Sequence, residues 1–115
     1  MAAILWFNPR CGTARNVQAW LDEHGKPYEV REYLKDPPSR AEIEDVLAKG
    51  KMQASDLLRE KEPLAEELGL RGSGDQDAIL AAMADNPILI NRPVIIDGDR
   101  AKLCRPSETI ADFYA

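Results

Sequence analysis

Cys11 is the residue best suited to chemistry in this chain, because it stands between a short apolar run and a helical pattern. A thiol at the N-terminus of a helix faces unpaired backbone N–H groups and the positive end of the helix dipole. Both stabilise the thiolate, which is the nucleophilic form of cysteine. Arg10 and Arg15 add positive charge nearby, and Gly12 keeps the backbone close to the sulfur without a side chain in the way. The pattern predicts a reactive thiolate, although free cysteines are also often plain core residues.

No second thiol lies close to Cys11 in the sequence. A dithiol redox site would place another cysteine at position 14, where this chain has Ala14. The other cysteine, Cys104, lies near the end of the chain, after a predicted strand, and we interpret it as a buried core residue. We therefore expect a single nucleophile and no intramolecular disulfide, so that a second thiol must come from outside the chain.

Arginine makes up nine of the 15 basic residues. Arg59, Arg92 and Arg105 each stand at the end of a predicted element, where a side chain can point into a cleft. A guanidinium presents a rigid fork of donors that suits tetrahedral oxyanions. Taken singly, each of these arginines is better explained as a solvated surface charge. Together with one thiolate, they would form an oxyanion site.

The elements that must position these residues follow from apolar spacing and from breaker residues. Strands are expected at 3–7 and 27–33 and a hairpin at 94–104, whereas helices are expected at 13–24, 39–50, 75–84 and from 106, with shorter helical pieces at 55–70. This order, β-α-β, helices, then β-β-α, predicts one α/β domain over 1–115. It is a thioredoxin-like domain with a mixed four-stranded sheet and a helical insertion at about 39–85. Pro93 then precedes the third strand, where such folds place a cis peptide, so the Arg92–Pro93 bond is expected to be cis.

Composition narrows the class of protein. The formal net charge of −5 disfavours a nucleic-acid binder. No apolar run approaches the roughly 20 residues of a membrane helix, and the start of the chain lacks the basic region of a signal peptide. Two cysteines cannot build a disulfide-rich secreted scaffold, so a cytoplasmic protein is expected. With His24 as the single histidine, no zinc spacing is present and no metal is expected.

These residues together resemble the glutaredoxin-dependent arsenate reductase family over essentially the whole chain. The resemblance implies that the Cys11 thiolate attacks arsenate, and that glutathione and glutaredoxin then complete the reduction to arsenite, as in arsenic detoxification. It also implies that Arg59, Arg92 and Arg105 hold the oxyanion, with no bound cofactor and with a monomeric chain. Gly12, Thr13, Arg15 and Pro93 would support the site. The motifs that carry the resemblance are Asn8-Pro9-Arg10-Cys11-Gly12-Thr13-Ala14-Arg15-Asn16, Pro37-Pro38-Ser39-Arg40, Leu57-Leu58-Arg59, Asn86-Pro87-Ile88-Leu89-Ile90-Asn91-Arg92-Pro93 and Leu103-Cys104-Arg105-Pro106-Ser107-Glu108.

Two positions depart from the pattern of that family. Phe7 stands where some members have histidine, and Ala14 stands where they have serine. Both of the absent side chains would help to stabilise the thiolate. Two other functions stay open: a thioredoxin-like regulator that binds the RNA polymerase alpha subunit, and a related thiol reductase with another substrate. The regulators commonly carry a two-cysteine switch where this chain has Cys11 and Ala14, and they lack the full set of arginines.

Overall fold

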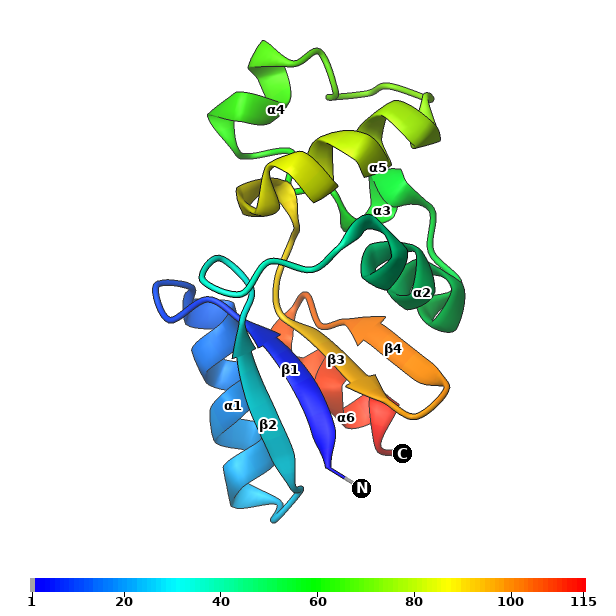
Figure 1. The fold of residues 1–115 in the computed structure, drawn as a ribbon. Coiled ribbons are helices and arrows are strands. Elements are labelled where there is room, and N and C mark those ends of the chain that lie inside the picture. The colour runs from blue at the N-terminus through cyan, green and yellow to red at the C-terminus, as the bar shows by residue number, and fades with distance from the viewer. Residues whose placement is uncertain (1) are drawn as a thin grey trace. The chain divides into compact units, whose positions relative to one another are not determined.

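The computed structural model describes residues 2–115, and these form two compact units (Figure 1). One unit contains residues 2–36 and 92–115, and the other contains residues 37–91. The range expected for the helical insertion, about 39–85, lies within the residues of the second unit. No helix within residues 2–115 is long and apolar enough to cross a membrane.

The first unit is built on a four-stranded sheet with the strand order β2-β1-β3-β4. Its strands are β1 (Ala3–Phe7), β2 (Tyr28–Glu32), β3 (Val94–Asp97) and β4 (Arg100–Leu103). β1 pairs with β2 in parallel and with β3 antiparallel, and β3 and β4 form an antiparallel hairpin. This mixed sheet confirms the predicted α/β class, and the elements follow one another along the chain in the predicted order.

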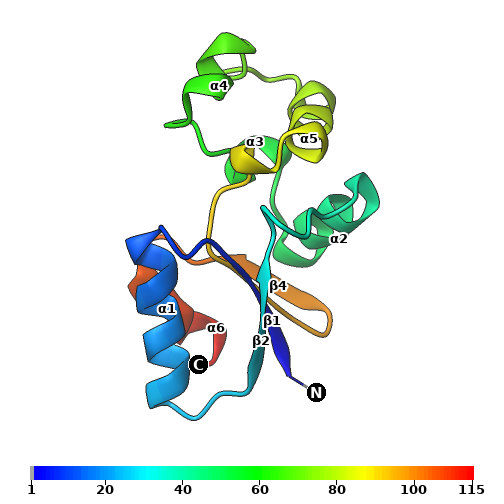
Figure 2. The same cartoon turned by 60° about the vertical axis from the view of Figure 1, so that its left-hand side comes forward.

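Two helices cover the same side of this sheet, α1 (Gly12–Glu23) and α6 (Ile110–Phe113) (Figure 2). Alternate side chains of β1 point toward them: Leu5 is fully buried, whereas its neighbour Ile4 is 38% exposed. This alternation is expected because successive strand residues face opposite sides of a sheet. The last helix begins as a 3-10 turn, η2 (Ser107–Thr109). The core between sheet and helices contains Ala3, Leu5, Phe7, Ala14, Val17, Leu21, Ile95, Ile110 and Phe113.

The second unit is helical. It contains α2 (Arg40–Gly50), α3 (Ala54–Leu57), α4 (Pro63–Glu67), α5 (Gln76–Asp85) and the 3-10 turn η1 (Pro87–Leu89). A capping box begins α2: Ser39 Oγ accepts the Glu42 backbone N–H at 3.1 Å, and Glu42 Oε1 accepts the Ser39 N–H at 3.0 Å. Pro63 is the first residue of α4, a position that tolerates proline because it needs no N–H donor.

Candidate functional site

Cys11 is the N-cap residue of α1, as the sequence predicts. β1 ends at Phe7, and the Asn8-Pro9 pair turns the chain into a short loop that delivers Cys11 to the helix N-terminus. The backbone of Cys11 is extended (φ −94°, ψ 118°), which is the usual conformation of an N-cap residue. Cys11 is 8% exposed, so the residue lies at the edge of the core.

The surroundings of Cys11 favour its ionised form. Burial alone raises the pKa of the thiol, but the backbone N–H of Ala14 and the guanidinium groups of Arg92 and Arg105 outweigh it and lower the pKa from 9.0 to about 7. The contact with the Ala14 N–H is looser than a capping hydrogen bond. Ala14 thus supports the thiolate through its backbone, although its side chain lacks a hydroxyl. About half of the thiol is ionised at pH 7, whereas a thiol with a pKa of 9 would be about 1% ionised.

The Arg105 side chain contacts the sulfur of Cys11. Its Nη1 atom lies 3.6 Å from Cys11 Sγ and donates to the backbone carbonyl of Arg92 at 2.9 Å. The hairpin explains this proximity, because the Cys104 N–H donates to the Pro93 carbonyl at 2.9 Å just beyond the paired strands. The residues that flank this hydrogen bond, Arg92 and Arg105, are therefore neighbours.

Arg92 is 8% exposed, and its guanidinium acts on Cys11 by a hydrogen bond and by its charge. The Arg92–Pro93 peptide bond is cis, which confirms the prediction. The Arg105–Pro106 bond is also cis, which the sequence analysis did not predict. One thiolate and two guanidinium groups give the site a net positive charge, so it can accept a further anion through charge-assisted hydrogen bonds.

The other predicted supporting residues are Arg15, Gly12 and Thr13, and their part in the anion site stays a prediction. Arg15 Nη1 donates to the Pro9 carbonyl at 3.0 Å, so Arg15 holds the loop that precedes Cys11. A Cβ atom added at Gly12 would meet only Arg15 Nη2, at 3.9 Å, which is an ordinary van der Waals distance. This distance leaves out the chain neighbours Cys11 and Thr13, so the expectation that Gly12 keeps the space near the sulfur free stays a prediction. Thr13 occupies the first turn of α1 and is half-buried.

Arg59 belongs to the second unit, whereas Cys11, Arg92 and Arg105 belong to the first. Its backbone N–H donates to the Leu89 carbonyl at 2.8 Å, and its Nη1 donates to Asn91 Oδ1 at 3.4 Å. Its Nε lies 3.9 Å from Glu62 Oε2. The participation of Arg59 in the anion site stays a prediction from the family resemblance.

Cys104 is a core residue. It is fully buried, and burial raises the pKa of its thiol to about 12. Its Sγ lies 3.8 Å from the Lys102 carbonyl oxygen. A thiol with this pKa is protonated at neutral pH and is a poor nucleophile, which agrees with the single-nucleophile interpretation.

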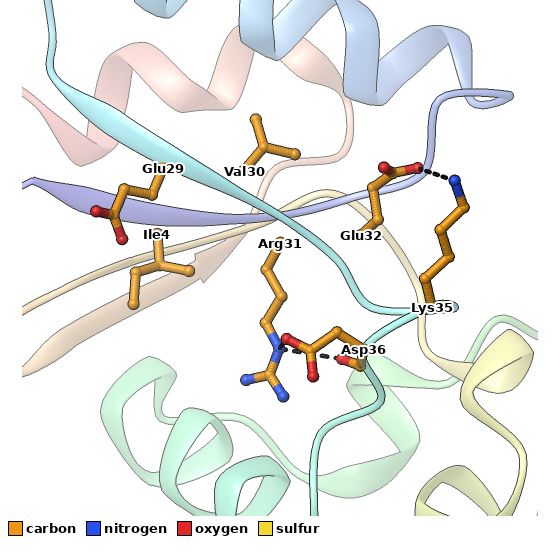
Figure 3. A pocket seen from close by; sticks show the side chains of 7 residues that line it. All are labelled: Ile4, Glu29, Val30, Arg31, Glu32, Lys35 and Asp36. Atoms are coloured by element: carbon orange, nitrogen blue, oxygen red, sulfur yellow. Dashed lines mark hydrogen bonds and ion pairs between the residues drawn. The ribbon is translucent and has the colours of Figure 1, made fainter.

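A separate hollow of about 430 Å³ lies along β2 (Figure 3) and does not suit an oxyanion. Arg31 Nε lies 3.3 Å from Asp36 Oδ2, and Lys35 Nζ lies 3.7 Å from Glu32 Oε1, so both cations in its lining face carboxylates. Acidic residues outnumber basic ones in the full lining, which consists of Ile4, Glu29, Val30, Arg31, Glu32, Lys35 and Asp36.

The fold and the site together define a class of protein: a thioredoxin-like domain with one activated cysteine beside two arginines. The ArsC family pattern matches residues 6–113, and the chain belongs to this family. The chain is 42% identical over 114 residues to the arsenate reductase of Rhizobium meliloti, covering 98% of this chain and 81% of that protein. It is 39% identical over 108 residues to the arsenate reductase of Neisseria meningitidis serogroup A, covering 92% of each. The solved structure of an arsenate reductase from Vibrio cholerae superposes with a TM-score of 0.90 at 32% identity, covering 97% of each chain.

Proposed function

We propose that this protein reduces arsenate to arsenite with Cys11 as its nucleophile. The observation that carries the proposal is the Cys11 sulfur at the N-terminus of α1, with Arg105 Nη1 at 3.6 Å and a pKa of about 7. A nucleophile that is half ionised near neutral pH, held beside two cations, suits attack on the central atom of a tetrahedral oxyanion. The family and the names of the relatives supply the identity of that oxyanion.

The first step forms a bond between sulfur and arsenic. Arg92 and Arg105, with Arg59 as the resemblance implies, bind the arsenate anion and offset its charge. The Cys11 thiolate attacks arsenic(V), and one oxygen leaves as hydroxide or, after protonation, as water. The product is a Cys11 thioarsenate in which arsenic has not yet been reduced.

The electrons come from two external thiols. Glutathione adds to the arsenic of the thioarsenate and displaces a second oxygen as water. The thiolate of glutaredoxin then attacks the glutathione sulfur, and the electron pair of the sulfur–arsenic bond returns to arsenic. Arsenic(V) becomes arsenic(III), and the two thiols become one glutaredoxin–glutathione disulfide. Water then releases arsenite from Cys11 and restores the thiol.

A coupled assay tests this proposal. Arsenate-dependent oxidation of NADPH is followed with glutathione, glutaredoxin and glutathione reductase present. We expect turnover by the wild type and none by Cys11→Ser, because a serine hydroxyl is not ionised near neutral pH. Omission of glutaredoxin, or its replacement by thioredoxin, should abolish turnover. Absence of arsenate-dependent oxidation with the complete system would refute arsenate as the substrate.

A further inference from the structure

Asn8 stands out because its side chain is buried beside the nucleophile. Asn8 is 4% exposed. Among residues 2–115, the other buried polar or charged residue is Arg92, which is 8% exposed. Buried polar side chains are almost always hydrogen-bonded, and each one requires an explanation. Arg92 is explained by its contact with Cys11, whereas the part played by Asn8 is not explained by the anion site itself.

Two hydrogen bonds link Asn8 to the loop that ends at Cys11. The side-chain carbonyl Oδ1 accepts the Arg10 backbone N–H at 2.9 Å, and the backbone carbonyl accepts the Cys11 N–H at 3.0 Å. The first is the pattern of an Asx turn, in which the side chain takes the place of a backbone acceptor. These two hydrogen bonds of Asn8 close the loop, and Arg15 Nη1 adds a third by donating to the Pro9 carbonyl at 3.0 Å.

We propose that Asn8 is a positioning residue for Cys11: its buried side-chain carbonyl closes the 8–11 loop and holds the thiol at the start of α1 without adding charge. Aspartate could accept the same N–H, but it would place a carboxylate beside a thiolate and an anionic substrate. An uncharged acceptor closes the loop and leaves the excess positive charge of the site intact. The inference rests on the proposed role of Cys11 as nucleophile, but its readout requires no arsenate.

The test measures the rate of alkylation of Cys11 by iodoacetamide against pH, in a Cys104→Ser background. Asn8→Ala removes the acceptor, and Asn8→Asp keeps it but adds charge. We expect both to raise the midpoint of the profile from about pH 7 to about pH 8, which leaves roughly fivefold less thiolate at pH 7. Asn8→Ser should keep a midpoint near that of the wild type, because a serine hydroxyl can accept the same N–H in a similar turn.

Asn16→Ala is the matched control, because Asn16 lies on an exposed position of α1 and should leave the midpoint unchanged. Circular dichroism and thermal melts establish which variants are folded. A folded Asn8→Ala variant with an unshifted midpoint would overturn the proposal and reduce Asn8 to a residue that only stabilises the fold. If Asn8→Ala does not fold, Asn8→Asp decides, since an unshifted midpoint in that variant also overturns the proposal. Arsenate turnover, measured separately, reports on the function and not on this inference.

Discussion

Replacement of Arg105 by glutamine should raise the pKa of the Cys11 thiol by about one unit. Arg105 Nη1 lies 3.6 Å from Cys11 Sγ. Two opposite unit charges at this distance attract by ~1.2 kcal/mol in a medium as polar as water and by roughly 5 kcal/mol at an effective dielectric constant of 20. The pKa falls from 9.0 to about 7 through Ala14, Arg92 and Arg105 together, acting against burial. Because this total shift is small, the attraction of ~1.2 kcal/mol is the appropriate value for Arg105, and it corresponds to about one pKa unit.

Glutamine is uncharged and shorter than arginine, so the change also removes the hydrogen bond that Arg105 Nη1 donates to the Arg92 carbonyl at 2.9 Å. The midpoint shift therefore reports the loss of the guanidinium as a whole. The alkylation profile should move its midpoint from about pH 7 to about pH 8. The plateau at high pH should rise about threefold, because a thiolate of higher pKa is intrinsically more nucleophilic. The midpoint is therefore the quantity to compare.

The assay is best run in a Cys104→Ser background with peptide mapping of the alkylated residue. Arg100→Gln is a suitable control, because Arg100 lies on β4 in the same unit and its guanidinium carbon sits 4.2 Å from the centre of the Phe113 ring. That control should keep the wild-type midpoint. An identical midpoint in Arg105→Gln and the wild type would refute the electrostatic role assigned to Arg105.

Three further results are expected. Replacement of any one of three arginines by lysine should lower kcat/KM for arsenate roughly ten- to a hundredfold: Arg59→Lys, Arg92→Lys and Arg105→Lys. A lysine keeps the charge but cannot form a bidentate fork. Wild-type kinetics in all three variants would rule out the arginine pocket. The Cys104→Ser variant should retain most activity. Mass spectrometry of wild-type enzyme quenched during turnover should show Cys11 bound to arsenic or glutathione. A Cys11–Cys104 disulfide would contradict the external-thiol mechanism. In denaturant titrations, the free energy of unfolding of the wild type relative to Cys11→Ser should rise by about 2 kcal/mol from pH 6 to pH 9. The reason is that folding lowers the pKa of Cys11 from 9.0 to about 7, which stabilises the native state above pH 7, and this contribution is lost below it. A difference that stays flat across this range would show that the folded protein does not favour the thiolate.

The elements of this chain could be predicted from local signals. Asn8-Pro9 ends the first strand, Ser39 and Glu42 form the capping box of α2, and Gly98 allows the turn of the β3–β4 hairpin with a positive φ of 61°. Such signals act within a few residues, so they can be read without knowledge of the fold. The placement of Cys11 at a helix N-terminus follows from the same local order of strand, turn and helix.

The spatial grouping around the sulfur was decided by the tertiary structure. Arg105 is 94 residues from Cys11, and only the pairing of β1, β3 and β4 brings its guanidinium to the thiol. The position of Cys11 at a helix N-terminus predicted support from backbone N–H groups, and the structure assigns this support to the N–H of Ala14. The burial of Asn8 could not be predicted from the local sequence, because burial depends on residues that only the fold brings together. Residue types and their order thus predict the nucleophile and the fold class, whereas contact distances and desolvation, which determine the pKa of Cys11, exist only once the sheet has formed.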